Sequence, residues 1–336
     1  MINALPLLPG IPVHIPRFEL KGRLGDRLRV VVVLFFIVLA VTLPVWPAGE
    51  DSIAVIYPDI GEPYRDVFGE IIKGVEDKVG TEVSSYAVSS DTDIAELKTR
   101  LHQQKAKVVI ALGRQGMKTA TALNDGPTVV GGVLTVPDSD AQRQPVITLS
   151  PDPALLFARI KALVPTTKRI SVVYDPGFND WLIKLARDAA TAQGLELVAY
   201  PAQDLRSAVK AYQKFFATAD GRSDALWMPQ DPTTAEENTI LPLVLQESWN
   251  QSIAVFSSNF SHVRRGVLFS LYPDNQGLGK RLAGLAEGIL NDAKDAAKPG
   301  LMSLRDVQSA VNVRTAKHLG ISTMSLKNFN LAFPDQ

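Results

Sequence analysis

The 336-residue sequence contains no cysteine. This absence excludes disulfide bonds, thiol catalysis, cysteine-based zinc sites and a lipidated N-terminal cysteine. Histidine is scarce as well, and the four histidines are scattered without metal-ligand spacing, at His14, His102, His262 and His318. We therefore expect no metal site and no cofactor.

An excess of charge of either sign is also missing. Lysine plus arginine and aspartate plus glutamate each number 35, so the formal net charge is zero. A nucleic-acid-binding domain usually shows a basic excess, and we expect no nucleic-acid partner. The apolar fraction of 46% is sufficient for the cores of two ordinary domains.

Motifs of catalysis are absent too, since the sequence has no nucleophile elbow, Walker loop or zinc motif. Two carboxylate pairs, Asp59 with Glu62 and Asp175 with Asp180, lie in turn-like segments where acidic residues are common. We therefore predict no catalytic residues and a protein that is not an enzyme.

The N-terminal region carries the signals of export. Five basic residues lie within residues 17–29, and residues 30–45 form an uncharged, mainly apolar run, a combination typical of an export signal. Cleavage after Ala48 would place Trp46 at the −3 position, where a small residue is preferred. Residues 30–48 approach the lower limit for a membrane span, so a cleaved signal peptide and a retained anchor helix both remain open.

These features predict a disordered basic region at residues 1–29, followed by the signal peptide or anchor at 30–48. The expected location is the periplasm, either free or tethered to the inner membrane by residues 30–48.

From Ser52 onward, short apolar runs alternate with amphipathic helical segments. Strands are expected at residues 52–57, 81–87, 108–112 and 128–133, with helices at 63–79, 94–104 and 114–124 between them. Strands joined by helices of this length form parallel sheets. The predicted fold class is α/β, with parallel sheets flanked by helices.

A repeat with an offset of 117 residues indicates two related units. The run from Ile53 to Asp59 resembles that from Ile170 to Pro176, and the strand near Val108 has a counterpart at Ala225. We predict two Rossmann-like lobes. The first covers residues 50–149 with part of the C-terminal tail, the second covers 150–271, and residues 272–336 form a crossover helix and tail.

Ligands of open parallel sheets lie beyond the carboxyl ends of the strands, which selects six loops. An anion is also favoured where a helix begins after the third strand, at Gly113. The candidate ligand-binding residues are Tyr57, Tyr64, Arg65, Gly113, Arg114, Gln115, Thr135, Asp175, Phe178, Asn179, Trp181, Gln230, Asp231 and Asn259.

Several segments resemble the periplasmic substrate-binding proteins of ABC transporters, in the group described as tryptophan/tyrosine-binding-like. The segments are ALGRQGMKTA (111–120), ISVVYDP (170–176), DALWMPQD (224–231) and SAVNVRTAKHLGI (309–321). The resemblance implies a periplasmic-binding-protein-like fold whose two lobes close on a small ligand, in some members an aromatic amino acid. It also implies a permease and an ATPase as partners.

We therefore predict a non-enzymatic, exported and monomeric solute-binding protein that captures a small molecule, such as an amino acid or a related compound, for an ABC importer. The alternative is a membrane-anchored periplasmic sensor or accessory protein that uses the same cleft to regulate a partner. The fate of residues 30–48 distinguishes the two.

Overall fold

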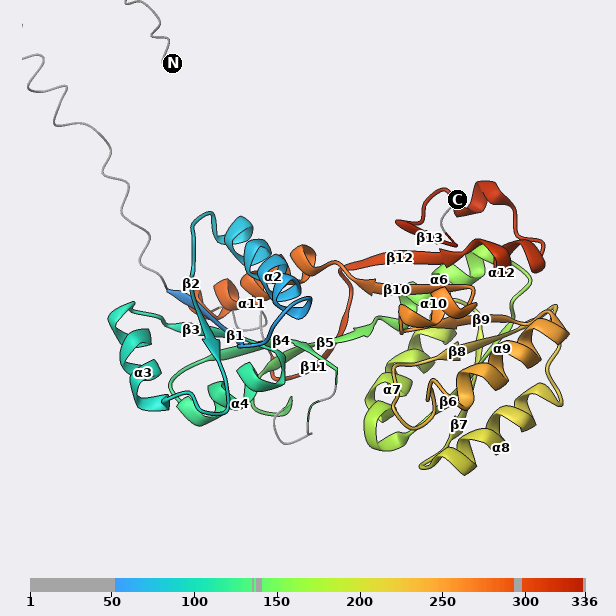
Figure 1. The fold of residues 1–336 in the computed structure, drawn as a ribbon, viewed down its shortest axis with the longest axis horizontal. Coiled ribbons are helices and arrows are strands. Elements are labelled where there is room, and N and C mark those ends of the chain that lie inside the picture. Colours follow the sequence, from blue (N-terminus) through green and yellow to red (C-terminus); the bar gives the residue numbers. More distant parts are fainter. Residues whose placement is uncertain (1–51, 135, 137–140, 293–297, 335–336) are drawn as a thin grey trace, which may run out of the picture. The chain divides into compact units, whose positions relative to one another are not determined.

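The computed structural model describes residues 52–134, 136, 141–292 and 298–334 (Figure 1). The predicted basic region, the predicted signal or anchor segment and Thr135 lie outside these residues. Within the described part of the chain, no helix combines the length and apolar character that a membrane span requires.

The first sheet has six strands in the order β11-β5-β4-β3-β1-β2, and all of its neighbouring pairs are parallel. Its helices connect successive strands or cover its faces (Figure 1). The elements are β1 (Ile53–Pro58), α2 (Tyr64–Val79), β2 (Ser84–Val88), α3 (Ile94–Gln103), β3 (Val108–Leu112), α4 (Gly113–Leu123), β4 (Thr128–Val133), β5 (Pro145–Pro151), α11 (Asn275–Leu290) and β11 (Gly300–Leu304).

Both faces of the first sheet are buried, which explains why its strands read as continuous apolar runs. In β1, Ile53 and Val55 pack with side chains of α2 and α11, whereas Ala54 and Ile56 pack with side chains of α3 and α4. Successive strand residues point to opposite faces, so one short run supplies both cores.

The second sheet has seven strands in the order β13-β12-β10-β9-β8-β6-β7. Strand β12 is antiparallel to β10, and the other neighbouring pairs are parallel. The elements are α6 (Pro153–Leu163), β6 (Arg169–Tyr174), α7 (Pro176–Ala192), β7 (Glu196–Pro201), α8 (Leu205–Phe216), β8 (Asp224–Met228), α9 (Ile240–Gln251), β9 (Ala254–Ser257), α10 (Ser261–Arg265), β10 (Phe269–Pro273), β12 (Val307–Asn312), α12 (Val313–His318), a 3₁₀ turn η1 (Thr323–Leu326) and β13 (Leu331–Phe333).

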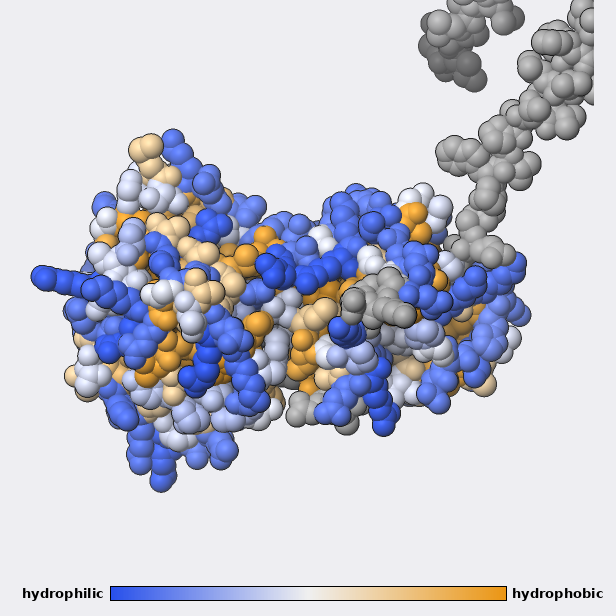
Figure 2. Space-filling model, turned by 180° about the vertical axis from the view of Figure 1, so that it is seen from behind, coloured by the Kyte–Doolittle hydropathy of each residue, from blue (hydrophilic) through white to orange (hydrophobic). Residues whose placement is uncertain are grey.

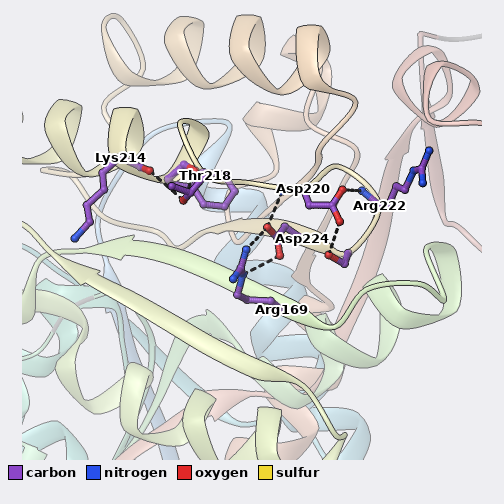
Figure 3. Close-up of polar contacts among 8 residues, drawn as sticks. Arg169, Lys214, Thr218, Asp220, Arg222 and Asp224 are labelled. Carbon is purple, nitrogen blue, oxygen red and sulfur yellow. Dashed lines mark hydrogen bonds and ion pairs between the residues drawn. The ribbon is translucent and has the colours of Figure 1, made fainter.

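An ion pair aligns the first residues of β6 and β8 (Figure 3). Arg169 donates from Nε to Asp224 Oδ1 (2.8 Å) and from Nη2 to Asp224 Oδ2 (2.5 Å). The backbone N–H of Asp220 also donates to Asp224, and Asp220 accepts hydrogen bonds from the Arg222 N–H and the Ser223 hydroxyl. These bonds to its carboxylate lower the pKa of Asp220 and fix the turn that leads into β8.

The sequence repeat is preserved in the strand register. In the first sheet Ile53 is the partner of Val108, and in the second sheet Ile170 is the partner of Ala225, the residues 117 positions later. The strand orders β5-β4-β3-β1-β2 and β10-β9-β8-β6-β7 correspond element by element. The two sheets are therefore copies of one topological unit, as the repeated segments indicate.

The chain runs between the two sheets at three places, which lie beside one another. Asp152 follows β5, and its N–H donates to Leu304 O (2.8 Å), while its carboxylate accepts from the Ser303 hydroxyl (3.1 Å). Asp274 follows β10, and its N–H donates to Asp306 O (3.0 Å) in the segment between β11 and β12. Hydrogen bonds thus join all three passages.

Several short elements depart from the sequence-based expectations. The second strand begins at Ser84 and not at residue 81. Strands β11 and β13 and helix α10 were not predicted. Each has only three to five residues, and none contains a continuous apolar run like that of β3, VVIAL.

Helices α2 and α11 cross at glycines, where their backbones touch (Figure 1). A Cβ atom placed on Gly279 would lie 2.0 Å from Ile71 O, and one placed on Gly74 would lie 2.1 Å from Gln276 O. These contacts are with backbone atoms, which cannot rotate away as a side chain can. The close crossing therefore requires glycine at both positions.

The close contact between α2 and α11 predicts how stability responds to the addition of one methyl group at Gly279. Replacement Gly279→Ala should lower the free energy of unfolding by about 3 kcal/mol or more, because α2 and α11 must separate to admit the Cβ atom. Urea denaturation followed by circular dichroism measures the change.

A matched control lies in the same helix. A Cβ atom on Gly284 would meet only Lys78 Cε, at 4.0 Å, so Gly284→Ala should leave stability unchanged or raise it by about 1 kcal/mol. Equal effects of the two replacements would show that the crossing is not tightly packed in solution.

Candidate functional site

The predicted ligand loops follow three adjacent strands in each sheet. These are β1, β3 and β4 in the first sheet and β6, β8 and β9 in the second. The strands of each set are parallel, so their carboxyl ends lie along one edge. Each sheet thus presents one group of three loops at the edge where open α/β sheets bind ligands.

In the first sheet, an aromatic ring joins the three loops. Phe68 of α2 lies 6.5 Å from Tyr57 between ring centroids. Its ring also borders Gly113, at the start of α4, and Gly132, near the end of β4. Gly113 has a φ of +67°, and a Cβ atom there would approach Pro58 and Phe68 to 3.0 and 3.3 Å. Phe68, which is not among the predicted ligand-binding residues, therefore lies against residues at the ends of all three strands.

The polar residues predicted in the first sheet lie at different depths. Tyr64 and Arg65 begin α2 and are exposed, and Arg114 is exposed in the first turn of α4. Gln115 is half-buried, and its Nε2 donates to Ser89 O (2.9 Å) in the loop after β2. Gln115 thus supports a neighbouring loop, whereas Tyr64, Arg65 and Arg114 face solvent.

In the second sheet, Asp231 joins the loops that follow β6 and β8. Its Oδ2 accepts from the Asp175 N–H (2.7 Å) and from Asn179 Nδ2 (2.9 Å). Its Oδ1 accepts from the N–H groups of Thr233 and Thr234, both at 2.9 Å. Asp231 is 4% exposed, and these four bonds occupy the acceptor positions of its carboxylate.

Asp175 has a related structural role. It is the N-cap of α7, and its Oδ1 accepts from the Gly177 N–H (2.9 Å). Its Oδ2 accepts from the Thr233 hydroxyl (2.9 Å), a partner that the sequence analysis did not select. The carboxylate of Asp175 accepts two hydrogen bonds, whereas that of Asp231 accepts four. Asp175 therefore has acceptor positions available for a further donor.

The two aromatic residues predicted beside this site differ in exposure. Phe178, in the first turn of α7, has 38% of its surface exposed. Trp181 is half-buried and packs against the hydrophobic cluster between α6, α7 and the sheet. Gln230 is half-buried, and its carbonyl group lies 3.4 Å from Asn179 Nδ2. Phe178 is therefore the aromatic side chain that this loop presents to solvent.

The loop after β9 is held by a buried histidine. Asn259 Nδ2 lies 3.3 Å from His262 Nε2, and Ser257 Oγ lies 3.0 Å from His262 Nδ1. The bonds are consistent with a neutral ring that accepts at Nε2 and donates from Nδ1, since Ser257 can then donate to Met228 O (3.1 Å). Asn259 also accepts from Ser261, so its side chain supports the loop.

Large apolar side chains remain exposed on these same loops. Figure 2 shows one face, where hydrophobic residues lie in small groups among hydrophilic ones. Ten large hydrophobic residues are exposed in the described part of the chain, and five belong to loops or first helical turns after β1, β4 and β6. These five are Ile60, Tyr64, Val67, Leu134 and Phe178. Three of them, Ile60, Val67 and Leu134, were not predicted as site residues.

The network around Asp231 predicts a strong dependence on its carboxylate. Replacement Asp231→Ala leaves four donors without an acceptor, two of them the N–H of Asp175 and the amide of Asn179. We expect the free energy of unfolding to fall by about 3 kcal/mol or more, measured by chemical denaturation.

Asp180 provides the control, because its carboxylate is half-exposed and pairs only with Lys184 one helical turn later among the described contacts. Asp180→Ala should change stability by less than about 0.5 kcal/mol. If Asp231→Ala were equally mild, the two loops would not depend on this carboxylate.

Burial of His262 makes stability depend on pH. Desolvation lowers the pKa of His262 from 6.5 to about 4, while nearby Glu237 acts in the opposite direction and Arg265 acts in the same direction. The unfolded chain therefore takes up the proton first as pH falls. The stabilisation is complete above pH 6.5 and declines towards pH 4, by roughly 3 kcal/mol in total.

Comparison with His262→Gln isolates this effect from the carboxylates that also titrate in acid. The difference in free energy of unfolding between the parent protein and His262→Gln should decrease by roughly 3 kcal/mol between pH 7 and pH 4, as measured by urea denaturation at each pH. A constant difference across this range would contradict a buried neutral imidazole.

The fold is similar to several solved structures. A ligand-free, open substrate-binding protein with adhesive properties from Clostridium difficile matches with a TM-score of 0.57 and 17% identity, covering 83% of this chain and 98% of that one. A conserved domain protein from Vibrio cholerae has a TM-score of 0.49 and 18% identity, with 84% and 99% covered. The ABC domain in complex with L-Trp from Streptococcus pneumonia has a TM-score of 0.47 and 19% identity, with 83% and 99% covered.

A search of curated protein sequences found no match. The model of one protein family, described as ABC transporter substrate binding protein, matches residues 67–326. This match extends from α2 to the 3₁₀ turn near the end of the chain and includes every strand of the two sheets except β1 and β13. The chain belongs to the ABC transporter substrate-binding protein family.

Proposed function

We propose that this protein captures a small molecule between the carboxyl-end loops of its two sheets and delivers it unchanged to an ABC importer. The observation that carries the proposal is the group of exposed apolar side chains on these loops, Phe178 and Tyr64 among them. Water-exposed aromatic and aliphatic side chains at a sheet's ligand edge gain free energy when a ligand covers them. Family membership supports the role of solute binding.

The ligand that fits best is an amino acid or a related compound with an apolar side chain. Phe178 and Tyr64 supply flat apolar surfaces, and Arg65 and Arg114 lie exposed beside the first-sheet loops. A guanidinium group pairs with a carboxylate through charge-assisted hydrogen bonds. The ammonium group of an amino acid needs a carboxylate partner, and Asp175 is a stronger candidate than Asp231, because protein donors occupy the carboxylate of Asp231.

The proposal includes export to the periplasm and a permease and ATPase as partners. The alternative is a tethered sensor or accessory protein that binds the same ligand and regulates a partner. Export is supported for both proteins by the basic stretch at residues 17–29 and the apolar run at residues 30–45. Trp46 is unfavourable at the −3 position of a cleavage site, which supports the tethered protein.

A ligand screen tests the proposed function. The full chain should show a higher melting temperature with one or more amino acids of the aromatic or branched aliphatic type, because ligand binding to the native state raises stability by mass action. Replacement Phe178→Ala should weaken binding of that ligand about tenfold in calorimetric titration, since an exposed ring contributes little to folding but covers the ligand.

Met324→Ala is the control, since Met324 is 73% exposed in η1, far along the chain from the six ligand loops. Its affinity should equal that of the unmodified protein. Absence of binding across the amino acids would refute the ligand class, and conversion of a bound compound into a product would refute a role without chemistry.

A further inference from the structure

A second candidate site lies at the opposite edge of the second sheet. An open pocket of about 960 Å³ is lined by residues of α9, α10, α12 and the end of β13. Its lining includes Ile253, which precedes β9, and Gly266, which lies shortly before β10. The pocket is thus at the amino ends of β9 and β10. The carboxyl end of β9 carries a predicted ligand loop, and the length of β9 separates this loop from the pocket by roughly 13 Å.

The lining of this pocket is strongly basic. It contains Arg264, Arg265 and Arg314, and no aspartate or glutamate is among the residues that line it. Arg265 lies 3.6 Å from Glu237, in an exposed ion pair of little strength. Neither Arg264 nor Arg314 has an ion pair within the described part of the chain. Among these three guanidinium groups, Arg265 alone therefore has a carboxylate partner in the described part of the chain.

Aromatic rings hold the two guanidinium groups that lack ion pairs. Arg264 lies over the rings of Phe260 (5.3 Å) and Phe333 (5.1 Å). Arg314 lies over the ring of Trp249 (5.5 Å), which is itself stacked on His318 with ring centroids 3.7 Å apart. Stacking uses the faces of a guanidinium group and leaves the N–H donors at its edge.

These donors have no acceptor among the described residues, since neither side chain makes a hydrogen bond there. A planar guanidinium group held in this way is prepared to bind a carboxylate or phosphate through two parallel bonds. The remaining lining includes the apolar side chains of Leu245, Ile253 and Leu319. The volume is within the range of pockets that enclose small organic molecules.

We propose that this pocket binds a small organic anion, whose carboxylate or phosphate group pairs with Arg264 and Arg314 and whose apolar body contacts Trp249 and the aliphatic lining. The site is separate from the carboxyl-end loops and does not depend on the function proposed for them. A ligand there contacts α9, α10, α12 and β13, so it joins the C-terminal strand to the body of the second sheet.

Calorimetric titration of the full chain with four probes tests the proposal. We expect 3-phenylpropionate or phenyl phosphate to bind with a stoichiometry of one, whereas acetate and the neutral 3-phenylpropanol bind at least tenfold more weakly. Arg314→Gln and Arg264→Gln should each weaken binding of the anion roughly tenfold, because each removes one charged bidentate donor. Arg314→Lys keeps the charge and loses the planar donors, so its affinity should lie between those of the parent and Arg314→Gln.

Two controls locate the binding. Arg222→Gln removes an exposed arginine whose side chain points away from its neighbours in Figure 3, and it should have no effect. Phe178→Ala, at the carboxyl-end loops, should also leave the anion's affinity unchanged, which separates this site from the first. Equal binding of the neutral probe, absence of binding by both aromatic anions, or parental affinity in both glutamine variants would each overturn the proposal.

Discussion

The packing of α11 on α2 is the contact on which the first sheet depends. Helix α11 follows β10 of the second sheet, yet its Leu278 and Leu282 contribute to the core on one face of the first sheet. A Cβ atom on Gly131 of β4 would lie 2.5 Å from Leu282 Cδ1, so the helix is also close to the strands. Without this helix, the part of this apolar face that α2 does not cover would be exposed to water.

Much of this architecture could be predicted from the sequence, because burial on both faces imposes a simple pattern. Runs such as residues 53–57 and 108–112 are apolar throughout, and the repeat with an offset of 117 residues recurs in the strand register. Strand β11 was missed because its position depends on pairing with β5, a contact across 150 residues that leaves no local pattern.

The loops could be located but their side-chain roles could not be assigned. A carboxylate after a strand is compatible with ligand binding and with loop support, and only the three-dimensional partners distinguish the two roles. Asp231 supports loops in this structure, whereas the ring of Phe178 is partly exposed to solvent. The basic pocket was not predicted because its arginines and rings come from four separate elements, none of which is distinctive alone.

The order of the strands has a consequence for synthesis. The first sheet contains the earliest described strand, β1, but its edge strand β11 ends at Leu304 of a 336-residue chain. During translation the first sheet and its core cannot be completed until α11 and β11 have been made. By then β6 to β10 of the second sheet are available to pair. Contacts this distant in sequence slow folding. The half of the protein that is made first therefore completes its sheet only after β6 to β10 of the second sheet have been made.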